Sequence, residues 1–244
     1  MTVGGWLSLL AATAHIDLKQ QVAATARLRT ASSLAFHTDH DEIQAWCLET
    51  EAWRCVTDGN YRQAVKLAQA AQSIAPAGSS ALTQATAQEG RAWARLHQGH
   101  ETYDAMDRVR TLAGSLPEHE RPGHHYRYDP DKVTAYSATT LAWLGDPAAE
   151  TYARGLITTL GDAEHTGKWP RRVASANLDL SLTLLTTDRL DEAAKTAHSA
   201  ISSGHVAPSN YWRALEVVTA VEAHGLPEAT ELREAYESLR STRR

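Results

Sequence analysis

The sequence is poor in the features that mark membrane, secreted and disulfide-bonded chains. Its 244 residues include two cysteines, one phenylalanine and eight prolines, and no apolar run approaches the roughly 20 residues that span a bilayer. Cys47 and Cys55 lie in one predicted helix with α-carbons about 12 Å apart, so they cannot form a disulfide with each other. Without a signal peptide or a disulfide framework, we expect a cytoplasmic location and no membrane association.

Excess basic charge and catalytic motifs are also missing. The formal net charge is −5, whereas a nucleic-acid-binding surface is usually basic. The sequence contains no Gly-x-Ser-x-Gly motif and no phosphate-binding glycine loop, and neither cysteine has positively charged neighbours beyond Arg54. We therefore expect no cofactor and no catalytic residues, and the chain is not predicted to be an enzyme.

Runs of alternating β-branched residues are scarce, while alanine recurs at helical spacing. Taking Gly59, Gly99, Gly145 and Asp188 as turn markers gives intervals of 40, 46 and 43 residues. Small or apolar residues follow each marker at i, i+4 and i+7, which places them on one helix face. The triplets are Ala64, Ala68, Ala71; Ala105, Val109, Leu112; Ala149, Ala153, Leu156; and Ala193, Ala197, Ala200.

The recurring pattern predicts helical hairpins, in which two helices are joined by a short turn. One hairpin cannot bury its apolar face alone, so successive hairpins must stack. The pattern predicts an all-α, right-handed superhelical solenoid of about five to six hairpins. It is expected to form one domain over residues 1–244 with a concave surface. Most of the seven tryptophans should fill gaps between layers of small residues.

Two predicted connections stand out. Residues 114–130 form a long link that contains His124, His125 and Tyr126, and long ordered loops are often functional. The histidines suit divalent metals, but Pro122 and Gly123 interrupt the spacing that helical metal motifs use, so no metal site is expected. The second connection, residues 161–170, leads into the paired charges of Arg171 and Arg172.

Two positive charges in the first turn of a helix oppose its macrodipole, so an acidic group should lie nearby. That group can be a protein carboxylate or a bound anion. If the first helix of each hairpin lines the concave side, several polar and aromatic residues share one groove. Alternatively, these residues form the contacts that hold one hairpin against the next. The candidate binding residues are His124, His125, Tyr126, Tyr136, Trp143, Trp169, Arg171, Arg172, Asn177, Asn210, Trp212 and Arg213.

The repeat resembles the tetratricopeptide repeat, most clearly between Ala45 and Pro76. Consensus positions there hold Ala52, Gly59, Tyr61, Ala64, Ala71 and Pro76. From Gly4 onward the chain also resembles the C-terminal sensor region of actinobacterial helix-turn-helix transcriptional regulators of the XRE type. That resemblance is carried by residues 124–126 with 129–130, and by 138–146, 169–172 and 209–213.

The resemblance implies a regulatory domain that binds a peptide or a small anionic ligand, or a protein partner. Such regulators begin with a DNA-binding helix-turn-helix, which the residues before Gly4 do not supply, so direct DNA binding by this chain is not expected. The chain is then an isolated sensor domain, the product of a downstream start, or a protein that acts through others. Two alternatives stay open: a scaffold or homodimerisation module without a small ligand, and an enzyme built on a repeat frame.

Overall fold

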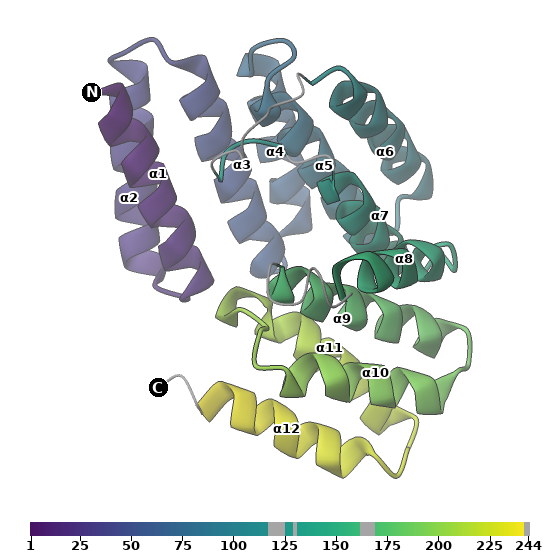
Figure 1. The fold of residues 1–244 in the computed structure, drawn as a ribbon. Coiled ribbons are helices and arrows are strands. Elements are labelled where there is room, and N and C mark those ends of the chain that lie inside the picture. Colours follow the sequence, from purple (N-terminus) through teal and green to yellow (C-terminus); the bar gives the residue numbers. More distant parts are fainter. Residues whose placement is uncertain (117–124, 129–130, 162–168, 242–244) are drawn as a thin grey trace. The chain divides into compact units, whose positions relative to one another are not determined.

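The protein is all-α. A computed structural model describes residues 1–116, 125–128, 131–161 and 169–241, which form twelve α-helices, one short 3-10 helix and no strand (Figure 1). The helices are α1 (Thr2–Asp17), α2 (Gln21–Phe36), α3 (Asp41–Thr57), α4 (Tyr61–Ile74), α5 (Ser80–Arg95), α6 (Gly99–Gly114), α7 (Asp131–Leu144), α8 (Ala149–Gly161), α9 (Pro170–Thr186), α10 (Leu190–Ser202), α11 (Tyr211–Ala223) and α12 (Ala229–Ser241). None of the helices in these ranges combines the length and apolar character needed to cross a bilayer.

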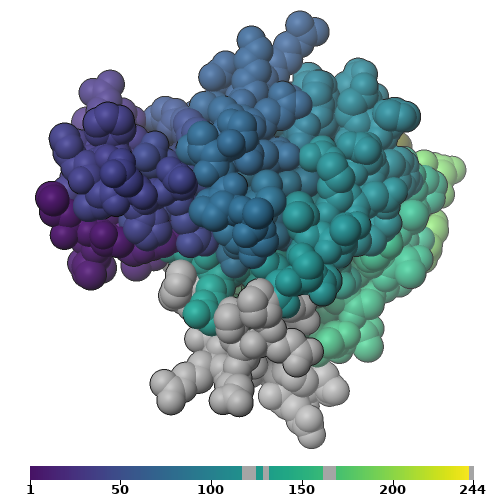
Figure 2. All heavy atoms as spheres, turned by 90° about the horizontal axis from the view of Figure 1, so that it is seen from above, coloured from purple at the N-terminus to yellow at the C-terminus, as the bar shows by residue number. Residues whose placement is uncertain are grey.

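Helices that follow one another in the chain pack in pairs, and the pairs belong to two compact units. Unit 1 comprises Met1–Val133 and unit 2 comprises Thr134–Arg244. In unit 1, α3 packs against α1, α2, α4 and α5, and α6 packs against α5. The α1–α2 hairpin, purple in Figure 2, forms one edge of that unit. The expectation of a single domain over residues 1–244 stays a prediction.

The predicted stripes of small residues lie at helix contacts. Ala64, Ala68 and Ala71 on α4 are fully buried, and the corresponding residues of α10 are also buried. Between α5 and α6 the approach is close at Gly90, where an added β-carbon would lie 3.1 Å from the Ala105 β-carbon. Small side chains at these positions therefore let paired helices approach, as the sequence indicates.

Four hairpins end their first helix with the same turn, and the connections after α2 and α7 repeat its left-handed residue and its hydrogen bond at Asp39 and Gly145. The residue two positions before the second helix is left-handed, with φ of 59° at Lys19, 77° at Gly59, 55° at His97 and 59° at Asp188. The following amide donates to the carbonyl five residues earlier, which is the Schellman motif. These bonds run from Gln20 to His15, Asn60 to Cys55, Gln98 to Trp93 and Arg189 to Leu184, with N to O distances of 2.8, 2.8, 3.1 and 2.9 Å.

The structure corrects one turn marker. Gly99 is the first residue of α6, and His97 holds the left-handed position instead. A side chain with a β-carbon is strained there by about 1 kcal/mol, because the carbon approaches the following carbonyl oxygen. The Schellman bond of Gln98 nevertheless maintains the turn.

Replacement of His97 by glycine is therefore expected to stabilise the protein. His97→Gly should raise the free energy of unfolding in urea by about 0.5–1 kcal/mol, since glycine adopts this conformation without strain. His100 is also exposed but helical, so His100→Gly should lower stability. Loss of stability in both variants would contradict the assignment of strain to His97.

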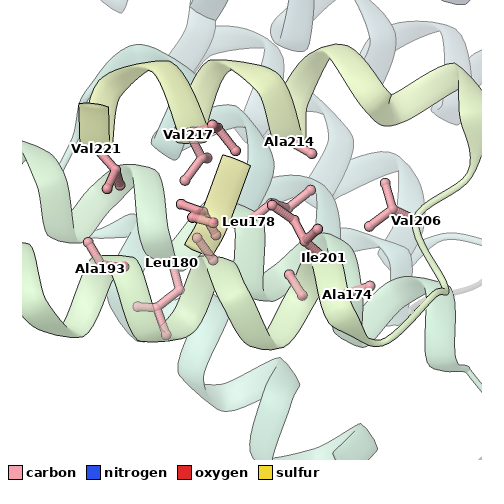
Figure 3. Packing of buried hydrophobic residues seen from close by; sticks show 14 of the residues in the cluster. Ala174, Leu178, Leu180, Ala193, Ile201, Val206, Ala214, Val217 and Val221 are labelled. Carbon is pink, nitrogen blue, oxygen red and sulfur yellow. The ribbon is translucent and has the colours of Figure 1, made fainter. Parts of the chain in front are cut away.

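A separate core fills each unit. In unit 2, apolar side chains of α9, α10 and α11 interdigitate around Leu178 and Ile201, with Val206 closing one end (Figure 3). In unit 1 the core joins α1, α2 and α3 around Leu9, Ile16 and Ile43. The core of unit 2 occupies one face of α9, which leaves another face for the polar residues described next.

Candidate functional site

The predicted site residues belong to both units. His125 and Tyr126 lie in unit 1, and the residues from Tyr136 to Arg213 lie in unit 2. His124 lies outside the described residues. The groove predicted to hold all of them together therefore stays a prediction, and the two groups are described separately.

Tyr126 is part of the core of unit 1. Its ring centroid lies 5.3 Å from that of Trp6 and 5.1 Å from that of Trp46, and its hydroxyl shares a 3.1 Å hydrogen bond with Thr13. Burial raises the pKa of this phenol well above its usual range. His125 is exposed and meets the Tyr126 ring edge-on. Tyr126 thus fastens residues 125–128 onto α1 and α3.

In unit 2, a buried ion pair joins two helices. Arg213 at the start of α11 pairs with Asp179 in the middle of α9, and their side chains are only 3% and 1% exposed. Thr139 of α7 donates a 2.7 Å hydrogen bond to the other carboxylate oxygen of Asp179. One carboxylate therefore ties α7, α9 and α11 together, and the positive charge of Arg213 is neutralised inside the protein.

Trp143 lies against this ion pair, and Trp212 lies against Trp143. The guanidinium carbon of Arg213 lies 5.4 Å from the centroid of the Trp143 ring, and the rings of Trp143 and Trp212 are 5.5 Å apart. Trp143 is buried, whereas Trp212 is half-buried. The aromatic pair therefore extends from the buried charges toward the surface.

Arg172 and Tyr136 share the helix faces of these residues. Arg172 precedes Asp179 by seven residues on α9, and Tyr136 precedes Trp143 by seven on α7, so each is two turns away on the same face. Both are half-buried, and the Arg172 guanidinium stacks 4.1 Å above the ring of Trp169, which is 37% exposed. We call this group the α7–α9–α11 cluster: Tyr136, Thr139, Trp143, Trp169, Arg172, Asp179, Trp212 and Arg213.

Three other predicted residues have different surroundings. Arg171 is exposed and lies one position around the helix from Arg172. Asn177 donates a 3.0 Å hydrogen bond to the Val173 carbonyl of its own helix. Asn210 ends the short 3-10 helix before α11. None of these contacts connects them to the buried ion pair.

The sequence interpretation missed a second buried carboxylate, Glu49 of α3. Gln84 of α5 donates a 2.9 Å hydrogen bond to it, and Arg91 and Lys132 act on it through their charges. Burial nevertheless dominates and raises the pKa of Glu49 to about 7. Arg91 stacks 4.7 Å above the ring of Trp53. A strip of polar and aromatic contacts thus runs between α3 and α5.

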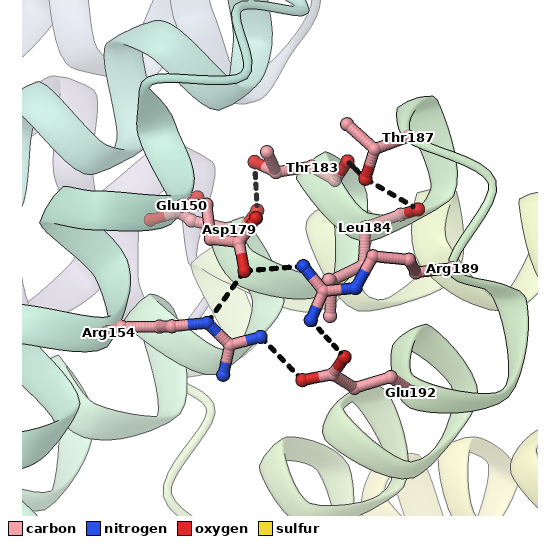
Figure 4. A network of polar contacts seen from close by, with 8 residues as sticks. All are labelled: Glu150, Arg154, Asp179, Thr183, Leu184, Thr187, Arg189 and Glu192. Carbon is pink, nitrogen blue, oxygen red and sulfur yellow. Dashed lines mark hydrogen bonds and ion pairs between the residues drawn. The ribbon is translucent and has the colours of Figure 1, made fainter.

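A third network lies at the surface of unit 2. Glu150, Arg154, Glu192 and Arg189 alternate in sign, and each arginine bonds both carboxylates (Figure 4). Hydrogen bonds from these arginines lower the pKa of Glu150 and of Glu192. Because these side chains are 26–44% exposed, water screens the pairs and they contribute little to stability.

Among the described residues, no group of three histidine, cysteine or acidic side chains is placed to hold a metal ion. Burial raises the pKa of the Cys47 thiol to about 12, and desolvation also raises that of Cys55. Comparisons with protein-family models, curated proteins and solved structures find no match. Inference about function therefore rests on the chain's own geometry.

Proposed function

We propose that this chain is a tetratricopeptide-like regulatory domain that binds a peptide or small anionic ligand at the α7–α9–α11 cluster. Binding is proposed to couple to a partner protein rather than to catalysis. The observation that carries the proposal is the placement of half-buried Arg172 and Tyr136 two turns from Asp179 and Trp143 on the same helix faces, with half-buried Trp212 beside Trp143. The paired helices and their repeated Schellman turns support a solenoid arrangement.

Arg213 and Arg172 have different roles in the cluster. Arg213 is buried and neutralised by Asp179, so it holds the three helices in register rather than facing a ligand. Arg172 is half-buried, and stacking on Trp169 orients its planar guanidinium, a group that binds carboxylate and phosphate. Tyr136 and Trp212 add apolar surface that suits a peptide side chain. Together these groups favour an acidic peptide.

Binding of an acidic peptide should depend on Arg172 and not on Arg171. Octapeptides rich in Asp and Glu are selected on the wild-type chain, and the best binder is titrated by fluorescence anisotropy. Arg172→Ala should weaken binding about tenfold or more, because a charge-assisted hydrogen bond is worth about 1.5–3 kcal/mol. Arg171→Ala, the matched control, should bind within about twofold of wild type.

Both variants should have the same midpoint urea concentration of unfolding as the wild type. This control separates loss of binding from loss of structure. Equal affinity of Arg172→Ala and wild type would contradict the proposed site. Equal weakening by Arg171→Ala and Arg172→Ala would indicate a diffuse effect of charge instead.

A further inference from the structure

Large exposed apolar side chains are concentrated in the first two helices. Ten such residues occur in the described parts of the chain, and seven of them lie within the first 36 residues. Those seven are Met1, Val3, Leu7, Leu10, Leu18, Val22 and Phe36, with exposed fractions from 45% to 87%. An apolar surface of this density usually marks an interface.

On α1 these residues form a continuous seam. Val3, Leu7, Leu10 and Ala14 are all exposed, and their spacing of four, three and four residues is that of the a and d positions of a coiled coil. The opposite face of α1 is already buried in unit 1 through Leu9, Ala12 and Ile16, among others. A helix that is apolar on both faces is expected to be covered on both.

We propose that the seam of α1 binds the same seam of a second copy of this chain, with the two helices antiparallel about a twofold axis. Leu7 then packs against the partner's Leu10, and Val3 packs against the partner's Ala14. This pairing sets Val3 against the smaller Ala14 and leucine against leucine, whereas a parallel pair would leave Ala14 facing Ala14. Antiparallel helices also oppose their macrodipoles favourably.

Charge and area both favour a second copy as the occupant. From Thr2 to Ala14, α1 contains no Asp, Glu, Lys or Arg, so two identical surfaces meet without repulsion. Met1, Val3, Leu7, Leu10 and the C-cap residue Leu18 each expose on the order of 100 Å², so a symmetrical pair of α1 helices buries roughly 1,000 Å², the size of a transient interface. This predicts a dimer with an affinity in the micromolar range.

Sedimentation of the whole chain between about 5 and about 200 µM tests the pairing, because mass action makes a dimer of this affinity concentration-dependent. The wild type should approach twice the mass of one chain at the upper concentration. Leu7→Glu and Leu10→Lys should each remain monomeric throughout while retaining wild-type helicity, since both side chains are exposed in the single chain. The matched control Leu215→Glu alters an exposed leucine on α11 and should still dimerise.

Mixing the two disrupted variants tests the antiparallel register. Leu7→Glu and Leu10→Lys bring opposite charges together only when residue 7 meets the partner's residue 10, so the mixture should form a heterodimer. A wild type that stays monomeric at about 200 µM overturns the proposal. Dimerisation unaffected by Leu7→Glu also overturns it, and failure of the mixture to associate overturns the antiparallel pairing.

Discussion

Arg213→Ala is expected to lower the free energy of unfolding by about 3–5 kcal/mol, because it leaves the buried Asp179 carboxylate without its cation. Asp179 is only 1% exposed, and the hydrogen bond from Thr139 cannot replace a full positive charge. Urea denaturation of the whole chain, followed by circular dichroism, measures the loss. The loss should exceed that caused by breaking any of the exposed ion pairs of unit 2.

Two comparisons separate the two ways in which Arg213→Ala can destabilise the protein, namely the unpaired buried charge of Asp179 and the loss of packing. The double variant Asp179→Leu with Arg213→Met removes both charges and keeps apolar volume, so it should be markedly more stable than Arg213→Ala. Arg189→Ala breaks an exposed pair with Glu150 and Glu192 and should change stability little. If Arg213→Ala were no more destabilising than Arg189→Ala, the proposed fastening of α7, α9 and α11 would be wrong.

Glu49 is expected to make the protein less stable as the pH rises from about 4.5 to about 7. The folded state retains the Glu49 proton up to a pKa of about 7, whereas an unfolded glutamate releases it near 4.5. The folded state therefore binds more protons in this interval, and stability falls as pH rises through it. Each unit of pKa difference corresponds to about 1.4 kcal/mol, so the full shift is worth about 3–4 kcal/mol, of which about 2–3 kcal/mol is lost between pH 4.5 and pH 7.

The difference between wild type and Glu49→Gln isolates this effect from other titrating groups. Glutamine keeps a neutral acceptor for the Gln84 amide at every pH. The variant's stability relative to wild type should therefore increase from pH 4.5 to pH 7 and level off above that range. Parallel pH profiles for the two proteins would show that the Glu49 pKa is not raised.

Helical periodicity predicted most of the fold, because each helix buries a stripe of residues at regular spacing. The four predicted triplets of small or apolar residues lie on α4, α6, α8 and α10. The turn marker at Gly99 was wrong because glycine usually occupies the left-handed position, whereas His97 does so in this turn, two residues earlier. The conformational preferences of residue types, which are all that the sequence provides, cannot show that a Schellman hydrogen bond holds a strained histidine in place.

The site was predictable only in part, because contacts between helices far apart in the sequence decide it. Tyr126 was placed in a binding loop, but its neighbours Trp6 and Trp46 come from α1 and α3, more than 70 residues earlier. The sequence around Asp179 does indicate a buried ion pair. This aspartate is the only charged residue between Arg172 and Thr187, and an isolated carboxylate on an apolar helix needs a buried partner.

The most direct test of the proposed binding site is fluorine NMR of the whole chain labelled with 5-fluorotryptophan. Unit 1 contains Trp6, Trp46, Trp53 and Trp93, while unit 2 contains Trp143, Trp169 and Trp212. Addition of the selected acidic octapeptide should shift the signals of the three tryptophans in unit 2 and leave those of unit 1 in place. Shifts confined to the tryptophans of unit 1 would contradict binding at the α7–α9–α11 cluster.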